Sequence, residues 1–211
     1  MIKTSELGHL VLALIILSFV ASWSFFRELS AYAFGLSFLL FIIILGFNTF
    51  FKKLVAYFYD TETEIKIWHL ERYGMKERQY FRTPIPMGIL VPFVLAIASL
   101  GIIPWYASLQ YNVTPLKYRA SRKHDYYSFS ELTEFHIGMI AGWAFVANLA
   151  VALIAYLINL PELAKLSIFY VAFNMLPISK LDGCKLFFGS QLAYFIIAAI
   201  TVIGLAFALI L

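Results

Sequence analysis

Long stretches without Asp, Glu, Lys or Arg are the feature that most constrains the fold of this chain. Six such stretches cover most of the sequence: Leu7–Phe26, Leu29–Phe51, Thr83–Leu116, Phe135–Pro161, Leu166–Ser179 and Leu186–Leu211. A helix needs about 20 apolar residues to cross the hydrocarbon of a bilayer, and five of the six reach that length. Only 13% of the residues are charged, against about 25% in soluble domains. The sequence therefore excludes a water-soluble enzyme and predicts an all-α integral membrane protein with one domain, residues 1–211.

The number of crossings depends on residues 83–116, which hold five of the seven prolines. Each proline removes a backbone donor, and such backbone survives at membrane depth only where protein or a water-filled cavity covers it. Basic residues, which are in excess on the cytoplasmic face, decide between two topologies. If the segment spans, the two faces hold nine and seven Lys and Arg residues, but if it enters and returns they hold fourteen and two.

We therefore expect about five spanning helices in the cell membrane, a cytoplasmic amino terminus, and a re-entrant helical hairpin over residues 83–116. The helices that end near Phe51 and Ile178 then run in the same direction and end at the same depth. Residues 61–70 partly alternate polar and apolar side chains, which predicts a short strand region at the membrane surface. The loop 117–127 mixes basic and tyrosine side chains, as in a topology signal or a contact with anionic lipid.

The net charge and the cysteine count restrict the molecules and metal ions that the protein is expected to bind. The net charge of +4 is mild and is expected to set orientation in the bilayer, which is a partner by necessity, rather than to bind nucleic acid. Cys184 is the only cysteine, so neither an intramolecular disulfide nor a cysteine zinc cluster is possible.

The segment from Asn174 to Gly183 carries the strongest chemical signal. Pro177 ends a regular helix, and the carbonyls that it frees need donors such as the Asn174 amide. The apolar run before Asp182 is short, so this carboxylate lies close to membrane depth. A carboxylate there is costly and points to function; the alternative is that Asp182 caps a turn together with Gly183.

The pattern Asn174-x-x-Pro177-x-x-x-Leu-Asp182-Gly183 resembles the second signature of the site-2 proteases, the intramembrane zinc metalloproteases. In that family this aspartate is the third zinc ligand. The segment 138–149, with its glycines and asparagine, is similar to the family's preceding helix. Residues 53–68 are similar to the stretch that follows the zinc helix in small archaeal-type members. The resemblance implies a fold built for intramembrane proteolysis.

The family's first signature, His-Glu-x-x-His near the end of the second helix, is absent from this chain. Its two histidines share a helix face and bind zinc, and its glutamate is the general base. Alignment of residues 53–68 with the family places Asn48 at the first histidine, Thr49 at the glutamate and Lys52 at the second histidine. An asparagine oxygen is a poor zinc ligand, threonine is no base at neutral pH, and an ammonium repels the cation.

The resemblance with these changes implies a pseudoprotease: a protein with no catalytic residues and no expected cofactor, which acts by binding membrane proteins or transmembrane helices. The alternative is an active zinc metalloprotease with unorthodox ligands, in which Asp182 holds metal. Glu6 and His9 are the nearest to a ligand pair that the rest of the chain offers. A small transporter ranks last, because the spans are almost purely apolar.

One hypothesis is specific to this sequence. It holds that Lys52, at a zinc-ligand position, faces the retained Asp182 and that an ammonium–carboxylate pair joins the two helix ends, since each desolvated charge needs a partner. The alternative is that Lys52 and Lys53 extend to the cytoplasmic interface as ordinary helix-end anchors.

Overall fold

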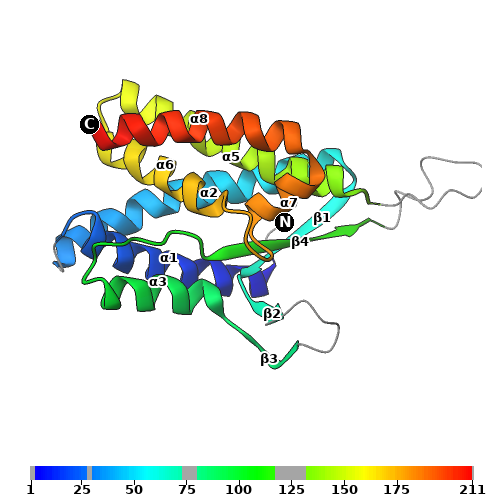
Figure 1. Cartoon of the computed structure of the whole chain (residues 1–211), viewed down its shortest axis with the longest axis horizontal. Coiled ribbons are helices and arrows are strands. Elements are labelled where there is room, and N and C mark those ends of the chain that lie inside the picture. The colour runs from blue at the N-terminus through cyan, green and yellow to red at the C-terminus, as the bar shows by residue number, and fades with distance from the viewer. Residues whose placement is uncertain (1–2, 28–29, 73–79, 117–131, 211) are drawn as a thin grey trace, which may run out of the picture.

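The computed structural model describes residues 3–27, 30–72, 80–116 and 132–210 (Figure 1). The helices are α1 (Thr4–Ser24), α2 (Ala31–Phe58), α3 (Met87–Ala98), α5 (Glu134–Leu157), α6 (Pro161–Asn174), α7 (Asp182–Gly189) and α8 (Gln191–Ile210). The strands are β1 (Thr61–Ile67), β2 (Leu70–Arg72), β3 (Tyr80–Ile85) and β4 (Leu109–Pro115). The predicted loop 117–127 lies almost wholly outside the described residues, and nothing described tests its role.

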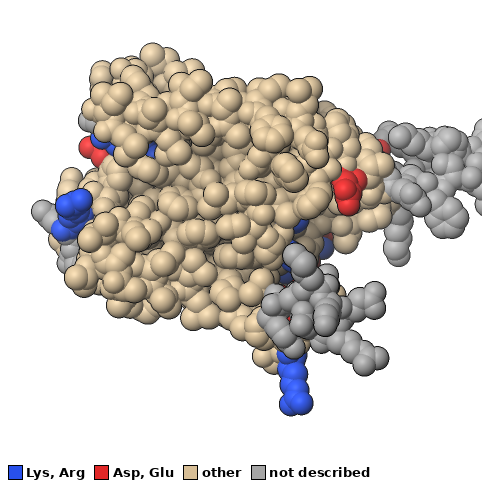
Figure 2. Space-filling view, viewed as in Figure 1, with Lys and Arg blue, Asp and Glu red and all other residues tan. Residues whose placement is uncertain are grey.

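Four helices of the described chain are long and apolar enough to cross a membrane: α1, α2, α5 and α8. The fourth predicted span, near 163–178, is the helix α6, which has only 14 residues and rises about 21 Å. Charged side chains on the face shown in Figure 2 lie near its two ends and on the projection at its lower edge, and the broad middle has none. This distribution suits a protein whose middle contacts hydrocarbon.

Helix α5 is the centre of the bundle. It packs against α2, α6, α7 and α8, while α1 packs against α2 on the other side. The side chains of Ala141, Ala144 and Phe145 on α5 are fully buried. Small residues let helix backbones approach closely, which is how helices associate when lipid replaces water around them.

The strand region expected at residues 61–70 is confirmed by β1. It pairs along its whole length with β4 in an antiparallel sheet, with Thr61 opposite Pro115 and Ile67 opposite Leu109. A second small antiparallel sheet joins β2 to β3. The described chain is mostly helical, as expected, and β2, β3 and β4 are strands in addition to the region predicted at residues 61–70.

The re-entrant helical hairpin predicted for residues 83–116 is wrong in its second half. The first half is α3, which packs against α1, and it ends where Leu100 and Gly101 adopt positive φ. A Cβ at Gly101 would lie 2.7 Å from the Trp23 ring of α1. The return leg is extended and finishes as β4. The physical reason is that pairing with β1 provides hydrogen-bond partners for the backbone groups of residues 109–115, so this segment does not need to form a helix.

The return itself agrees with the predicted path. Both ends of the excursion meet at Trp68, whose carbonyl accepts from Gly88 N–H and whose N–H donates to the Ser108 carbonyl. Because β4 then runs beside β1, the chain comes back to the end of the bundle at which α2 finished (Figure 1). Helix α5 consequently starts from that same end.

Candidate functional site

Lys52 and Asp182 form an ion pair inside the bundle. The Lys52 ammonium donates to Oδ2 of Asp182, and each side chain is only 1% exposed. Lys52 lies on α2 and Asp182 is the first residue of α7, 130 positions later. The carboxyl end of α2 and the segment that follows α6 therefore meet at one depth, as predicted.

Asn48 and Thr49 lie one helical turn before Lys52. Residues four apart share a helix face, and all three side chains are buried, with exposed fractions of 1% for Asn48 and 5% for Thr49. The face that the resemblance assigned to zinc binding thus points into the protein. It presents an amide, a hydroxyl and an ammonium.

The turn between α6 and α7 positions Asp182. Helix α6 ends at Asn174, and Pro177 follows in the irregular segment. The Asn174 amide donates to the carbonyls of Tyr170, one turn earlier, and of Tyr106. This is the role predicted for it, because the end of the helix leaves carbonyls without helical donors. Gly183 then lies directly against the backbone of Met175.

Two residues that sequence reasoning missed complete the site. Tyr111 of β4 is fully buried, and its hydroxyl donates to the Ile137 carbonyl at 2.6 Å. The Lys185 ammonium lies 3.8 Å from the centroid of the Tyr111 ring and the Lys52 ammonium 5.0 Å from it. An aromatic face attracts cations, so Tyr111 stabilises both ammonium groups. Lys185 follows Asp182 by one helical turn, and this spacing could have indicated from the sequence that the two side chains lie on the same face of a helix.

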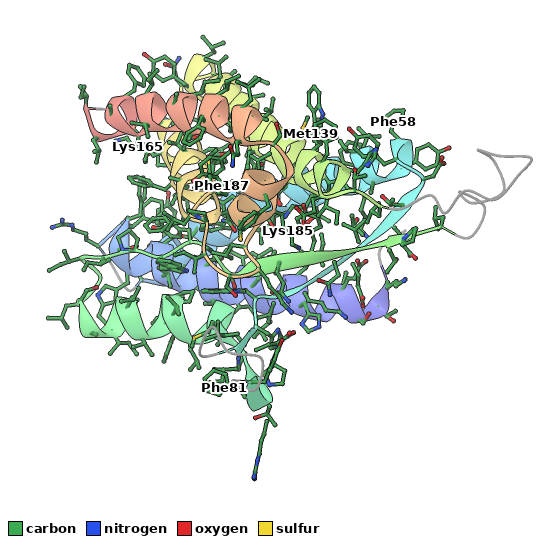
Figure 3. All side chains as sticks on the ribbon, turned by 45° about the vertical axis from the view of Figure 1, so that its right-hand side comes forward. Phe58, Phe81, Met139, Lys165, Lys185 and Phe187 are labelled. Atoms are coloured by element: carbon green, nitrogen blue, oxygen red, sulfur yellow. The ribbon has the colours of Figure 1, made fainter. Side chains whose placement is uncertain are left out.

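Lys185 also donates to the backbone carbonyl of Tyr111, and Figure 3 shows it on α7 above strand β4. Burial, with the charges of Lys52 and Lys180 acting in the same direction, lowers the pKa of Lys185 to about 8, although Asp182 opposes the shift. Burial and the Asp182 charge raise the pKa of Tyr111 well above its usual value. Asp182 is thus paired with Lys52 and acts on Lys185 only through its charge.

Side chains also occupy both outer edges of the β1–β4 sheet. On β1, the buried Glu6 carboxylate accepts from Ile65 N–H at 3.0 Å, and Lys53 donates to the Thr63 carbonyl at 3.3 Å. Lys53 is also paired with Glu6 at 2.8 Å. On β4, the contact from Lys185 occupies an outward carbonyl. Charged side chains on edge strands oppose uncontrolled pairing with other chains.

The residues present do not fit zinc. The Lys52 ammonium occupies one oxygen of Asp182, and Asn48 and Thr49 offer only an amide and a hydroxyl. Glu6, which was considered together with His9, is instead bound to Lys53 and to backbone N–H groups. Within the described parts of the chain, no three His, Cys, Asp or Glu side chains lie close enough together to hold a metal ion.

Buried polar side chains occur in several helices of the bundle. Several buried side-chain atoms have no hydrogen-bond partner among the described residues, and these include Asn48 Nδ2, both amide atoms of Asn148, Asn174 Oδ1 and Asp182 Oδ1. They come from α2, α5, α6 and α7. Polar atoms without a hydrogen-bond partner in the described part of the chain are therefore contributed by four different elements of the bundle.

No protein-family model matches the chain, and comparisons with curated proteins and with solved structures find no match either.

Proposed function

We propose that this chain is a multi-pass membrane protein of site-2-protease type that has lost catalysis and works by binding segments of other membrane proteins. The observation that carries the proposal is the buried ion pair between Lys52 and Asp182. It joins the position of a zinc-binding histidine to the position of the zinc-binding aspartate. An ammonium there holds together the two helix ends that a metal ion holds in the family.

The energetics support a retained structural role for Asp182. A carboxylate taken out of water costs several kcal/mol unless a partner compensates for it. Lys52 supplies that partner. Thr49, where the family has its glutamate base, is buried and has no acid–base chemistry near neutral pH. These side chains support a role in association rather than in proteolysis.

The small sheet offers a means of association. In the family, strands in this region are thought to hold an extended substrate by edge pairing, a mode in which main-chain hydrogen bonds supply the affinity. The outer edge of β1 is occupied by Glu6 and Lys53. The outer edge of β4 faces α7, and there Lys185 binds the Tyr111 carbonyl. An extended segment that pairs with β4 must displace Lys185 from this carbonyl.

Rebuilding the zinc motif tests the proposal. The triple variant Asn48→His, Thr49→Glu, Lys52→His restores the His-Glu-x-x-His spacing opposite Asp182. We expect it to bind about one zinc ion per chain, measured by elemental mass spectrometry of the purified protein. The matched control adds Asp182→Asn to the triple variant and is expected to lose most of the zinc.

Two results would contradict the proposal. One is a folded triple variant that binds no more zinc than the wild-type protein, which would mean that residues 48, 52 and 182 are not placed as in the family. The other is a wild-type protein with nearly one zinc ion per chain that Asp182→Asn removes, which would favour the active metalloprotease.

A further inference from the structure

A groove lies on the opposite half of the bundle from the ion pair, where α5, α6 and α8 come together. Its volume is about 350 Å³, and nearly all of its wall is apolar. Pockets of this size that are mostly apolar and carry few polar groups are typical ligand sites. Nothing in the proposed function uses it.

Small side chains create the groove. Ala152 on α5, Gly204 and Ala208 on α8 and Ala164 on α6 all line it. A Cβ on Gly204 would be in ordinary contact with Ile168 of α6, at 3.6 Å, and both residues line the groove. Because α6 has only 14 residues, it does not fill the space beside two helices that span the bilayer.

The groove runs along the helices and ends at a lysine. Its lining residues come from the carboxyl half of α5, the amino half of α6 and the carboxyl half of α8. These three parts meet at the end of the bundle where the α5–α6 turn and the carboxyl terminus lie (Figure 1). At that end the edge-to-face pair of Tyr156 and Phe207, with centroids 5.2 Å apart, closes the gap between α5 and α8.

Lys165 lines the groove and is half-buried. Figure 3 shows it on α6, beneath α8 and toward the carboxyl terminus. It forms no ion pair with another described residue. Glu162, one turn earlier on α6, does not line the groove. A groove whose wall is apolar apart from one ammonium matches an amphiphile with an acyl chain and an anionic headgroup.

We propose that this groove binds an anionic phospholipid of the membrane, with one acyl chain along Ala152, Gly204 and Ala208 and the phosphate on Lys165. Hydrocarbon fills the space that the short α6 leaves, and the ammonium provides the charge complementarity. A zwitterionic lipid has the same chains but carries its own cation beside the phosphate, so it competes less well for Lys165. This proposal does not depend on the proposed function.

Native mass spectrometry of the purified protein tests the site, with dioleoylphosphatidylglycerol and dioleoylphosphatidylcholine as the two probes. We expect one tightly bound phosphatidylglycerol per chain and weaker binding of phosphatidylcholine. Lys165→Gln should weaken phosphatidylglycerol binding about fivefold, since a lysine near an anionic headgroup contributes about 1 kcal/mol. Lys165→Arg should retain the binding. Arg27→Gln removes one positive charge just after α1, which ends at the same end of the bundle as α8 (Figure 1), and should leave the binding unchanged.

A groove-filling variant separates the acyl-chain contact from the charge. Gly204→Leu occupies the hollow and keeps Lys165, so it should reduce binding of both lipids. Equal binding of the two lipids by the wild-type protein, or equal losses in Lys165→Gln and Arg27→Gln, would overturn the proposal. So would a dimer that Gly204→Leu dissociates, because the occupant would then be a helix of a second copy.

Discussion

At the level of single residues, Lys52 and Asp182 show why an ionisable pair persists in an apolar bundle. Each charge alone would face a large desolvation penalty, and the pair removes most of it. Neighbouring groups add to the effect, since the Tyr111 ring lies under both Lys52 and Lys185. The side chains of the site are therefore strongly coupled, and removing either Lys52 or Asp182 leaves the charge of the other buried without its partner.

A double-mutant cycle measures that coupling. Lys52→Met and Asp182→Asn should each lower the free energy of unfolding by about 3–5 kcal/mol, because each leaves a buried partner unpaired. The double variant should lose clearly less than the sum of the two. Unfolding in mixed detergent micelles, followed by circular dichroism, supplies the four values. Strictly additive losses would show that the two side chains do not act as a pair.

Gly183 is the second residue of the motif with a steric requirement. A Cβ at this position would lie 2.1 Å from the Met175 carbonyl oxygen, whereas a Cβ at Gly46 on α2 would meet nothing within 4 Å. We expect Gly183→Ala to destabilise the protein by about 1–3 kcal/mol or more, because backbone must move. Gly46→Ala should be neutral or stabilise α2 by up to about 1 kcal/mol. Thermal unfolding of the two variants tests the difference, and equal effects would refute it.

At the level of elements, the β1–β4 sheet depends on charged side chains from three helices. Glu6 of α1 and Lys53 of α2 hold the edge of β1, and Lys185 of α7 holds the edge of β4. A two-stranded sheet alone is marginally stable, so these contacts tie it to the bundle. The same contacts decide which edge another chain can reach.

The lowered pKa of Lys185 gives this arrangement a measurable pH dependence. Folding shifts the pKa from 10.5 to about 8, so the unfolded chain binds more protons between these values and the free energy of unfolding rises with pH across that window. Below about pH 8 both states are protonated and Lys185 contributes no slope. The groups that face it are Asp182, Lys52, Lys180 and Cys184.

We expect a rise of up to about 3 kcal/mol between pH 8 and 10.5 in the wild-type protein, from about 1.4 kcal/mol per pKa unit, and little of it in Lys185→Met. Lys66→Met removes an exposed lysine that pairs with Glu64 and serves as the control, which should keep the rise. Detergent unfolding at a series of pH values makes the comparison. Parallel curves for the wild-type protein and Lys185→Met would contradict the buried position of this ammonium.

At the level of the whole molecule, the orientation of the bundle in the bilayer follows from the basic residues. Because the excursion of residues 83–116 returns to its starting side, the count made from the sequence still predicts fourteen Lys and Arg residues on one face and two on the other. The side with fourteen is expected to be cytoplasmic. The α1–α2 and α5–α6 turns then lie outside.

Cysteine labelling tests this topology in a Cys184→Ser background. In intact cells, a membrane-impermeant maleimide should label Tyr32→Cys and Leu160→Cys, which replace exposed residues near the two outer turns. Tyr57→Cys, at the exposed end of α2, should react only after lysis. Labelling of all three in intact cells, or the reverse pattern, would refute the orientation.

Much of the architecture was predictable because apolar stretches and proline act locally. The long stretches indicated α1, α2, α5 and α8, and the five prolines of residues 83–116 correctly argued against a simple span. The form of the return leg was not predictable in this way. Residues 109–115 form a strand because β1 lies beside them. The local sequence of residues 109–115 does not reveal that residues 61–67 pair with them.

What the sequence alone determined is that long stretches of this chain favour an apolar environment and that the Asp182 carboxylate stands between two of them, since the transfer free energy of a side chain depends on its own chemistry. Only the tertiary structure decided how that carboxylate is compensated. Lys52 reaches Asp182 across 130 positions, and Lys185 reaches Tyr111 across 74. The free energy of such contacts exists only once packing has brought the partners together and excluded water, so it belongs to the fold.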